Sequence, residues 1–182
     1  IAALAFMLGG FITSHVVFPM MVGAAVWLPL VLTAIERLVQ RQLLDESGGP
    51  SLAACLADVA LGVLAMGMVM LAGHPEMYYY VGLTAGAYGL WRLVAIVRRC
   101  GWGAASRTVG LLLSMALLGI GLGAAQWIPL LEFVQVNWRQ GGASLADVQG
   151  WAWPLRRAVA LLVPDFFGNP SHHSWFNLFS GL

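Results

Sequence analysis

One set of polar side chains that could take part in chemistry lies in the short run Gly73-His74-Pro75-Glu76. A histidine changes its charge near neutral pH, and a carboxylate can accept a proton from a reacting hydroxyl group. His74 and Glu76 could therefore serve a site at the surface of the protein. A structural role is the alternative, because proline is well placed just inside a helix start and glutamate suits its positive end.

A second set consists of Gln126, Pro129, Glu132 and Arg139. Pro129 should end or kink a helix and free backbone carbonyls, which a membrane protein tolerates at a buried or wet site. Glu132 and Arg139 are expected to emerge together and could form an ion pair, although an exposed pair contributes only about 0–1 kcal/mol. Structural and functional interpretations both remain open.

A third set combines Asp165 with His172 and His173, while His15 stands apart near the start of the chain. An acid and two histidines suggest a metal ion, but adjacent histidine rings do not readily face one ion, and no further ligand is fixed by spacing. We therefore expect no metal or other cofactor. His15 is expected in a break between two helices, where it could bind a substrate.

Asp58 is the only acid expected well inside a membrane-spanning segment, and such acids are functional candidates by default. It lies about two turns from the cytoplasmic helix end, so the alternatives are that its side chain snorkels to the interface or pairs with an arginine. The run Gly119-Ile120-Gly121-Leu122-Gly123 resembles a dinucleotide motif but falls within a helix. Small residues there predict instead that a neighbouring helix approaches closely.

The amino-acid composition indicates what kind of protein carries these candidate residues. Of the 182 residues, 60% are hydrophobic and only 9% are charged, against about 25% charged in a soluble domain. So few charges indicate that lipid surrounds most of the chain. No basic patch interleaved with aromatic residues is present, so nucleic acid is not an expected partner.

We expect an all-α, polytopic transmembrane helix bundle, since about 20 apolar residues cross a membrane. Because the chain opens with Ile1 inside an apolar run, we interpret it as an internal fragment. A loop or short interfacial segment is expected at 10–18, and residues 133–182 should form an extracytoplasmic loop with a short interfacial helix around 154–163. The expected spans, about five with the first partial, are 1–9, 19–41 (kinked at Pro29), 51–72, 76–98 and 105–128.

The arginines predict the orientation, because basic residues concentrate in cytoplasmic loops. Six of them fall on one side of the predicted spans, whereas the connection at 73–76 carries none. The arginine-bearing loops should be cytoplasmic, and the segment 10–18, the His74 turn and the tail 133–182 should face outward. The six are Arg37, Arg41, Arg92, Arg98, Arg99 and Arg107.

Several of these strings together resemble the YfhO-type bacterial membrane proteins, relatives of the polytopic C-type glycosyltransferases. The matching strings span most of residues 21–170 in the order of the family, and jointly they are moderately specific. They are Ala25-Val26-Trp27-Leu28-Pro29-Leu30 running into Ile35-Glu36-Arg37-Leu38, Gly73-His74-Pro75-Glu76 followed by tyrosines, Gln126, Pro129 and Glu132 with Arg139 downstream, and Pro164, Phe166, Phe167 and Gly168.

The resemblance implies a multi-pass protein of the bacterial cytoplasmic membrane. It would transfer a sugar from a polyprenyl-phosphate carrier to an extracytoplasmic acceptor, such as a cell-envelope glycan or lipid. Its catalytic carboxylate is expected in an outer loop ahead of Ile1, so that no catalytic residue can be assigned here. The substitute candidates are Glu76, Glu132 and Asp165, and the expected substrate-binding residues are His15, His74, Gln126 and Arg139.

Two other functions remain open. A transporter or flippase of a lipid-linked substrate would need polar residues along a path through the membrane midplane, where only Asp58 qualifies. A non-catalytic membrane scaffold would need none of these side chains for chemistry.

Overall fold

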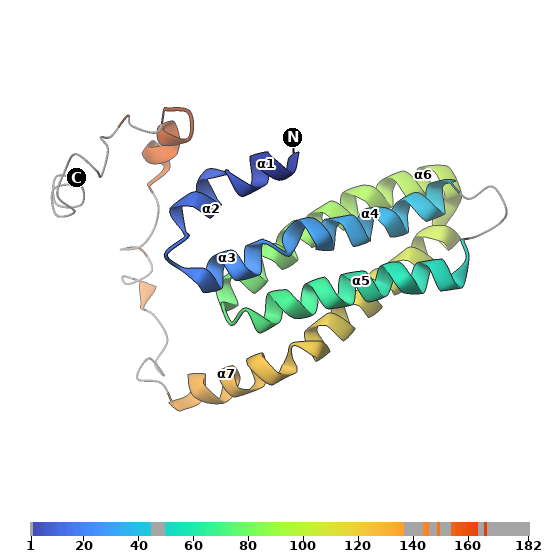
Figure 1. Ribbon diagram of the computed structural model, residues 1–182. Helices are drawn as coiled ribbons and strands as arrows, with labels where there is room; N and C mark the ends of the chain where they lie inside the picture. The colour runs from blue at the N-terminus through green and yellow to red at the C-terminus, as the bar shows by residue number, and fades with distance from the viewer. Residues whose placement is uncertain are drawn as a thin grey trace. The chain divides into compact units, whose positions relative to one another are not determined.

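The structure is a computed structural model that describes residues 2–44, 50–136, 144–145, 149, 154–163 and 166. The chain divides into two compact units, Ile1–Val136 and Asn137–Leu182. The first unit is helical throughout its described part (Figure 1). Its helices are α1 (Ala2–Met7), α2 (Gly10–Ser14), α3 (Pro19–Ala25), α4 (Leu28–Leu44), α5 (Leu52–Leu71), α6 (Pro75–Leu122) and α7 (Ala124–Val136).

Three helical stretches are long and apolar enough to cross a membrane, namely Pro19–Leu44, Leu52–Leu71 and Pro75–Leu122. The protein is therefore an all-α protein of the membrane type, with fewer such stretches than the five segments expected. The segment expected at 51–72 corresponds to α5. The segments expected at 76–98 and 105–128 correspond to the two arms of α6 on either side of the non-helical residue Gly101, although the second arm ends at Leu122.

Helix α6 folds back on itself at Gly101. As one straight rod its 48 residues would measure about 72 Å, more than twice the roughly 30 Å of a bilayer core. Gly101 alone has non-helical angles, with φ of 81°, a conformation that glycine adopts without steric cost. A Cβ added to Gly89 would lie 3.7 Å from Leu112, so the arms 75–100 and 102–122 run antiparallel and side by side (Figure 1).

The helix expected at 19–41 is interrupted between α3 and α4, just ahead of Pro29. Helix α3 ends at Ala25, two residues form a turn, and α4 begins at Leu28. Proline has no N–H to donate to the carbonyl four residues back, and its ring clashes with that carbonyl. Placing Pro29 in the first turn of α4 avoids both costs, which explains why the expected kink becomes a short interruption.

Glycines let α5 pack directly against the second arm of α6. A Cβ on Gly119 would lie 2.6 Å from Met66 Cβ, and one on Gly123 would lie 2.2 Å from Met70 Cβ. Gly121 has no such neighbour within 4 Å. The expectation that this run serves close helix packing is therefore confirmed for Gly119 and Gly123, which are four residues apart and share a helix face.

The ends of the expected pattern differ from the structure. The segment expected at 1–9 is the short helix α1, and the interfacial segment expected at 10–18 contains α2. Helix α7 continues to Val136, past residue 133 where the outer loop was expected to begin. Pro129 lies inside α7 without ending it. In the second unit, a 3-10 helix covers Leu155–Leu161, where a short helix around 154–163 was expected.

The glycine contacts give a stability prediction. Gly119→Ala and Gly123→Ala should each lower the free energy of unfolding by about 1–3 kcal/mol, because the added methyl group overlaps a methionine Cβ. Gly121→Ala, on the open face of the same arm, should change it by less than about 0.5 kcal/mol. Unfolding of the purified chain in mild detergent measures all three variants. Equal effects at the three positions would contradict the packing described here.

Candidate functional site

The turn before α6 is shaped by its own sequence. Gly73 has φ of 77°, which favours glycine, and Pro75 occupies the first position of the helix. Between them His74 is the N-cap residue in an extended conformation, with no side-chain capping bond. Its Nδ1 is buried and has no hydrogen-bond partner among the described residues. The ring nitrogen is therefore not used to stabilise the start of the helix.

Gln126 on α7 reaches this turn. Its Nε2 lies 3.0 Å from the position that a Cβ on Gly73 would occupy. Nearby, the hydroxyl group of Tyr78 donates to the carbonyl of Met70 at 2.6 Å, which ties the first turn of α6 to the end of α5. The structure thus brings His74 and Gln126, two of the expected substrate-binding residues, to the same turn.

Glu76 and His15 each interact within their own segments. Glu76 is exposed on the first turn of α6, where Oε1 accepts a hydrogen bond from Tyr80 at 2.8 Å. The His15 ring stacks on Phe11, with centroids 4.4 Å apart, and its Nδ1 lies 2.9 Å from the Phe11 carbonyl. Among the described residues no hydrogen bond or ring contact joins His15 to the His74 turn.

The remaining expected site residues are only partly described. Glu132 is exposed on α7, six residues beyond Gln126. Arg139 and Asp165 lie outside the described residues, as do His172 and His173. The expected pair between Glu132 and Arg139 and the third set of candidates therefore remain expectations.

At the opposite end of the first unit, Asp58 is fully buried on α5 between two arginines of α4. The Nε of Arg41 donates to Asp58 Oδ2, and the Nε of Arg37 lies 2.6 Å from Oδ1. The Arg37 contact is an ion pair without good hydrogen-bond geometry, since Oδ1 has no hydrogen-bond partner among the described residues. The alternative that Asp58 pairs with an arginine is confirmed.

A second carboxylate, Glu36, forms a larger network across α4 and α6. Arg92 binds it through two bonds, Nε to Oε2 at 2.7 Å and Nη2 to Oε1 at 2.8 Å. Tyr88 donates to Oε2 at 2.9 Å and Gln40 to Oε1 at 2.6 Å. The guanidinium of Arg92 also lies 5.6 Å from the Trp91 ring. Paired charges of this kind satisfy the donors and acceptors that lipid cannot.

The Glu36 network was not expected from the sequence, where Asp58 was the only acid expected well inside a span. Glu36 lies within the candidate span Pro19–Leu44, and Arg92 within Pro75–Leu122. Because a charge inside the membrane requires a partner, the presence of Glu36 in one apolar stretch and Arg92 in another could have predicted their pairing. Arg92 was used only to predict the orientation of the helices in the membrane.

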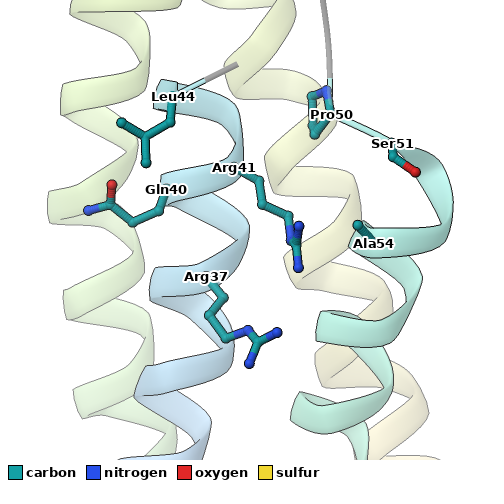
Figure 2. A pocket seen from close by; sticks show the side chains of 7 residues that line it. All are labelled: Arg37, Gln40, Arg41, Leu44, Pro50, Ser51 and Ala54. Carbon is teal, nitrogen blue, oxygen red and sulfur yellow. The ribbon is translucent and has the colours of Figure 1, made fainter.

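One pocket lies at each of two places in the first unit, beside the Asp58 ion pairs and between the arms of α6. The first, of about 550 Å³, lies beside the Asp58 pairs and is lined by Arg37, Gln40 and Arg41 with residues from the start of α5 (Figure 2). The second, of about 440 Å³, is apolar and lies between the arms of α6, α5 and Ile35 of α4. Tyr78, Gly82 and Gly86 line it on the arm that follows His74.

In the part of the chain that the structure describes, no group of three or more histidine, cysteine, aspartate or glutamate side chains could hold a metal ion. No protein-family model matches the chain, and neither a curated protein nor a solved structure matches it at a significant level.

The Glu36 network makes a prediction. Glu36→Leu should lower the free energy of unfolding by about 2–3 kcal/mol, because Arg92 loses its partner in apolar surroundings; the value falls below the roughly 3–5 kcal/mol of a fully buried pair, since Glu36 is 31% exposed. The double variant Glu36→Leu, Arg92→Leu should recover most of that loss, since an apolar pair can replace an ion pair. Unfolding in detergent measures both. A double variant less stable than Glu36→Leu would contradict this account.

Proposed function

We propose that the chain is part of a multi-pass glycosyltransferase-like protein of the bacterial cytoplasmic membrane. It would transfer a sugar from a polyprenyl-phosphate carrier to an extracytoplasmic acceptor, a glycan or lipid of the cell envelope. The observation that carries the proposal is the convergence of His74 and Gln126 at one turn, with a buried ring nitrogen that is not used by the fold.

The chemistry of such a transfer needs donors for the phosphate leaving group and a base for the acceptor hydroxyl. His74 and Gln126 provide donors beside the start of α6, whose free N–H groups also favour an anion. Glu76, two residues further along the chain, is the described carboxylate closest in sequence that could serve as the base. In this proposal Glu132, Asp165, Arg139 and His15 keep the roles expected from the resemblance.

A lipid carrier also needs an apolar surface beside its phosphate. The pocket between the arms of α6 extends from Tyr78, one turn beyond His74, to Leu93. Gly82 and Gly86 leave it open, since a Cβ on either would meet nothing within 4 Å. This space suits part of a hydrocarbon chain whose phosphate lies at the His74 turn.

The arrangement favours an enzyme over a transporter. A polar path through the bilayer would need unpaired polar side chains in the interior. Among the described residues the buried polar or charged side chains are Gln42, Asp58 and Thr108. Asp58 is neutralised by arginines, and Thr108 donates to the carbonyl of Ala104 at 3.0 Å.

The number of passes and their orientation form part of the proposal. Each arm of α6 is about 32–39 Å long at 1.5 Å per residue, enough to cross the bilayer separately. Pro19–Leu44, α5 and the two arms would then give four complete passes. Since basic residues concentrate on the cytoplasmic side, the end with Arg37, Arg41 and the Gly101 reversal would lie inside and the His74 turn outside.

Cysteine labelling tests this orientation. Cys100, beside the Gly101 reversal, is exposed, whereas Cys55 is buried. A membrane-impermeant maleimide should label Cys100 only after the cells are permeabilised. In a Cys100→Ser background, Glu76→Cys should be labelled in intact cells. Labelling of both positions from the same side would show that the proposed orientation is wrong.

A second experiment tests the activity itself. In membranes holding the full-length protein, His74→Ala and Gln126→Ala should each lower sugar transfer from a polyprenyl-phosphate donor by about 10–100-fold, the effect of losing a hydrogen bond to a charged group. Tyr79→Phe, which removes an exposed hydroxyl group near the same turn, should stay within about twofold. Expression and unfolding of each variant are compared with the parent. Wild-type rates for both His74→Ala and Gln126→Ala would refute the proposed site.

A further inference from the structure

The pocket at the arginine end of the first unit has the composition of an anion site. It is lined by Arg37, Gln40, Arg41 and Leu44 of α4 and by Pro50, Ser51 and Ala54 at the start of α5, and its volume is about 550 Å³. Figure 2 shows the two arginine side chains extending from α4 toward the start of α5. The pocket lies apart from the His74 turn and plays no part in the proposed transfer.

The two arginines are only partly used by the fold. A guanidinium carries five N–H donors, and Asp58 engages the Nε of each arginine. The Nη groups of Arg37 and Arg41 have no hydrogen-bond partner among the described residues. Their side chains are 53% and 33% exposed, so these donors remain open to a ligand. Counting the described residues alone, two cations facing one carboxylate leave one positive charge uncompensated at the pocket.

The start of α5 adds to this positive potential. Ser51 is the N-cap of α5 but makes no side-chain capping bond, and the first backbone N–H groups of a helix have no partner within it. They carry a partial positive charge that favours anions. Ser51 and Ala54 line the pocket, so the helix start and the arginines act on the same space.

The surroundings of the pocket are those of a membrane interface. Leu44, on its rim, is 74% exposed, and Trp102, beside the Gly101 reversal, is 79% exposed. Tryptophan is enriched at the level of the lipid headgroups. The thiol of Cys100 contacts the carbonyl of Gln42 at 3.5 Å, which places the reversal beside the end of α4.

We propose that this pocket binds a phosphate ester group, with Arg37 and Arg41 as its donors and the start of α5 behind it. Arginine forks match phosphate oxygens in geometry and charge. The position at the end of apolar helices favours the headgroup of an anionic phospholipid as the source, because basic pockets between such helices bind these headgroups. A water-soluble phosphate is the other source of the same chemistry.

The chain also offers an internal competitor. Asp45 and Glu46 lie in the sequence between Leu44 and Pro50, outside the described residues, and both neighbours line the pocket. The experiment must therefore separate a bound phosphate from the chain's own carboxylates.

The test uses the full chain purified in an uncharged detergent. Native mass spectrometry measures retention of phosphatidylglycerol against phosphatidylcholine, and thermal unfolding measures the effect of inorganic phosphate against chloride of equal ionic strength. The variant is Ala54→Glu, which brings a negative charge into the pocket and keeps both arginines and Asp58. Its matched control is Ala53→Glu, with the same charge one residue earlier on an exposed position outside the pocket.

The wild type and Ala53→Glu should retain phosphatidylglycerol in preference to phosphatidylcholine, and Ala54→Glu should bind it about tenfold or more weakly, as expected for one like charge nearby. If inorganic phosphate raises the unfolding temperature in the same two proteins, the proposal holds with a soluble source. Ser51→Asp, an acid that also suits an N-cap, replaces Ala54→Glu if that variant fails to fold. The proposal is overturned if neither ligand binds, if the variant and its control behave alike, or if binding appears only after Asp45→Asn and Glu46→Gln.

Discussion

The exclusion of uncompensated charge from an apolar surrounding is the constraint on which the rest of this structure depends. Asp58 and Glu36 are the two carboxylates held within the bundle of α4, α5 and α6, and each is bound by arginine. Because α4 supplies one carboxylate and two of the arginines, it is connected by charge to both neighbours. The ion pairs therefore fix which faces of the three helices meet at one end.

Glycine provides the complementary constraint along the length of the bundle. Where α5 meets the second arm of α6, methionine side chains lie over Gly119 and Gly123. Between hydrocarbon surfaces there is little hydrophobic gain from association, so that close contact and dispersion attraction must hold the helices together. The ion pairs hold the helices together at one end of the bundle. The glycine contacts hold α5 against the second arm of α6 along its length.

The sequence predicted the class of fold because the scarcity of charge is a property of the whole chain. It also predicted the role of Gly119 and Gly123, since small residues four apart define one helix face. It also predicted separate helices before and after residues 99–104, where α6 reverses at Gly101. It could not predict that one glycine would suffice for the reversal, because a sequence does not reveal backbone angles. Pro129 was expected to end or kink a helix, and it lies inside α7 without ending it. The sequence does not show whether a helix ends at a proline or continues through it.

The candidate site was predicted in part. His74 and Gln126 were selected from separate motifs, and only the tertiary contact between Gly73 and Gln126 joins them. The Glu36 network was missed because its members are 56 residues apart and each was interpreted singly. Opposite charges in two apolar segments predict an ion pair only if the two segments are known to be neighbours. A single sequence does not show which segments are neighbours.

The sequence distances within the two ion-pair networks have a consequence for biogenesis. Arg41 precedes Asp58 by 17 residues, so a chain made from its N-terminus already holds both partners of that carboxylate when it emerges. Glu36 must wait for Arg92, made 56 residues later. During synthesis the hairpin of α4 and α5 can therefore leave the translocation machinery with Asp58 neutralised, whereas Glu36 stays in contact with water or the machinery until the first arm of α6 arrives.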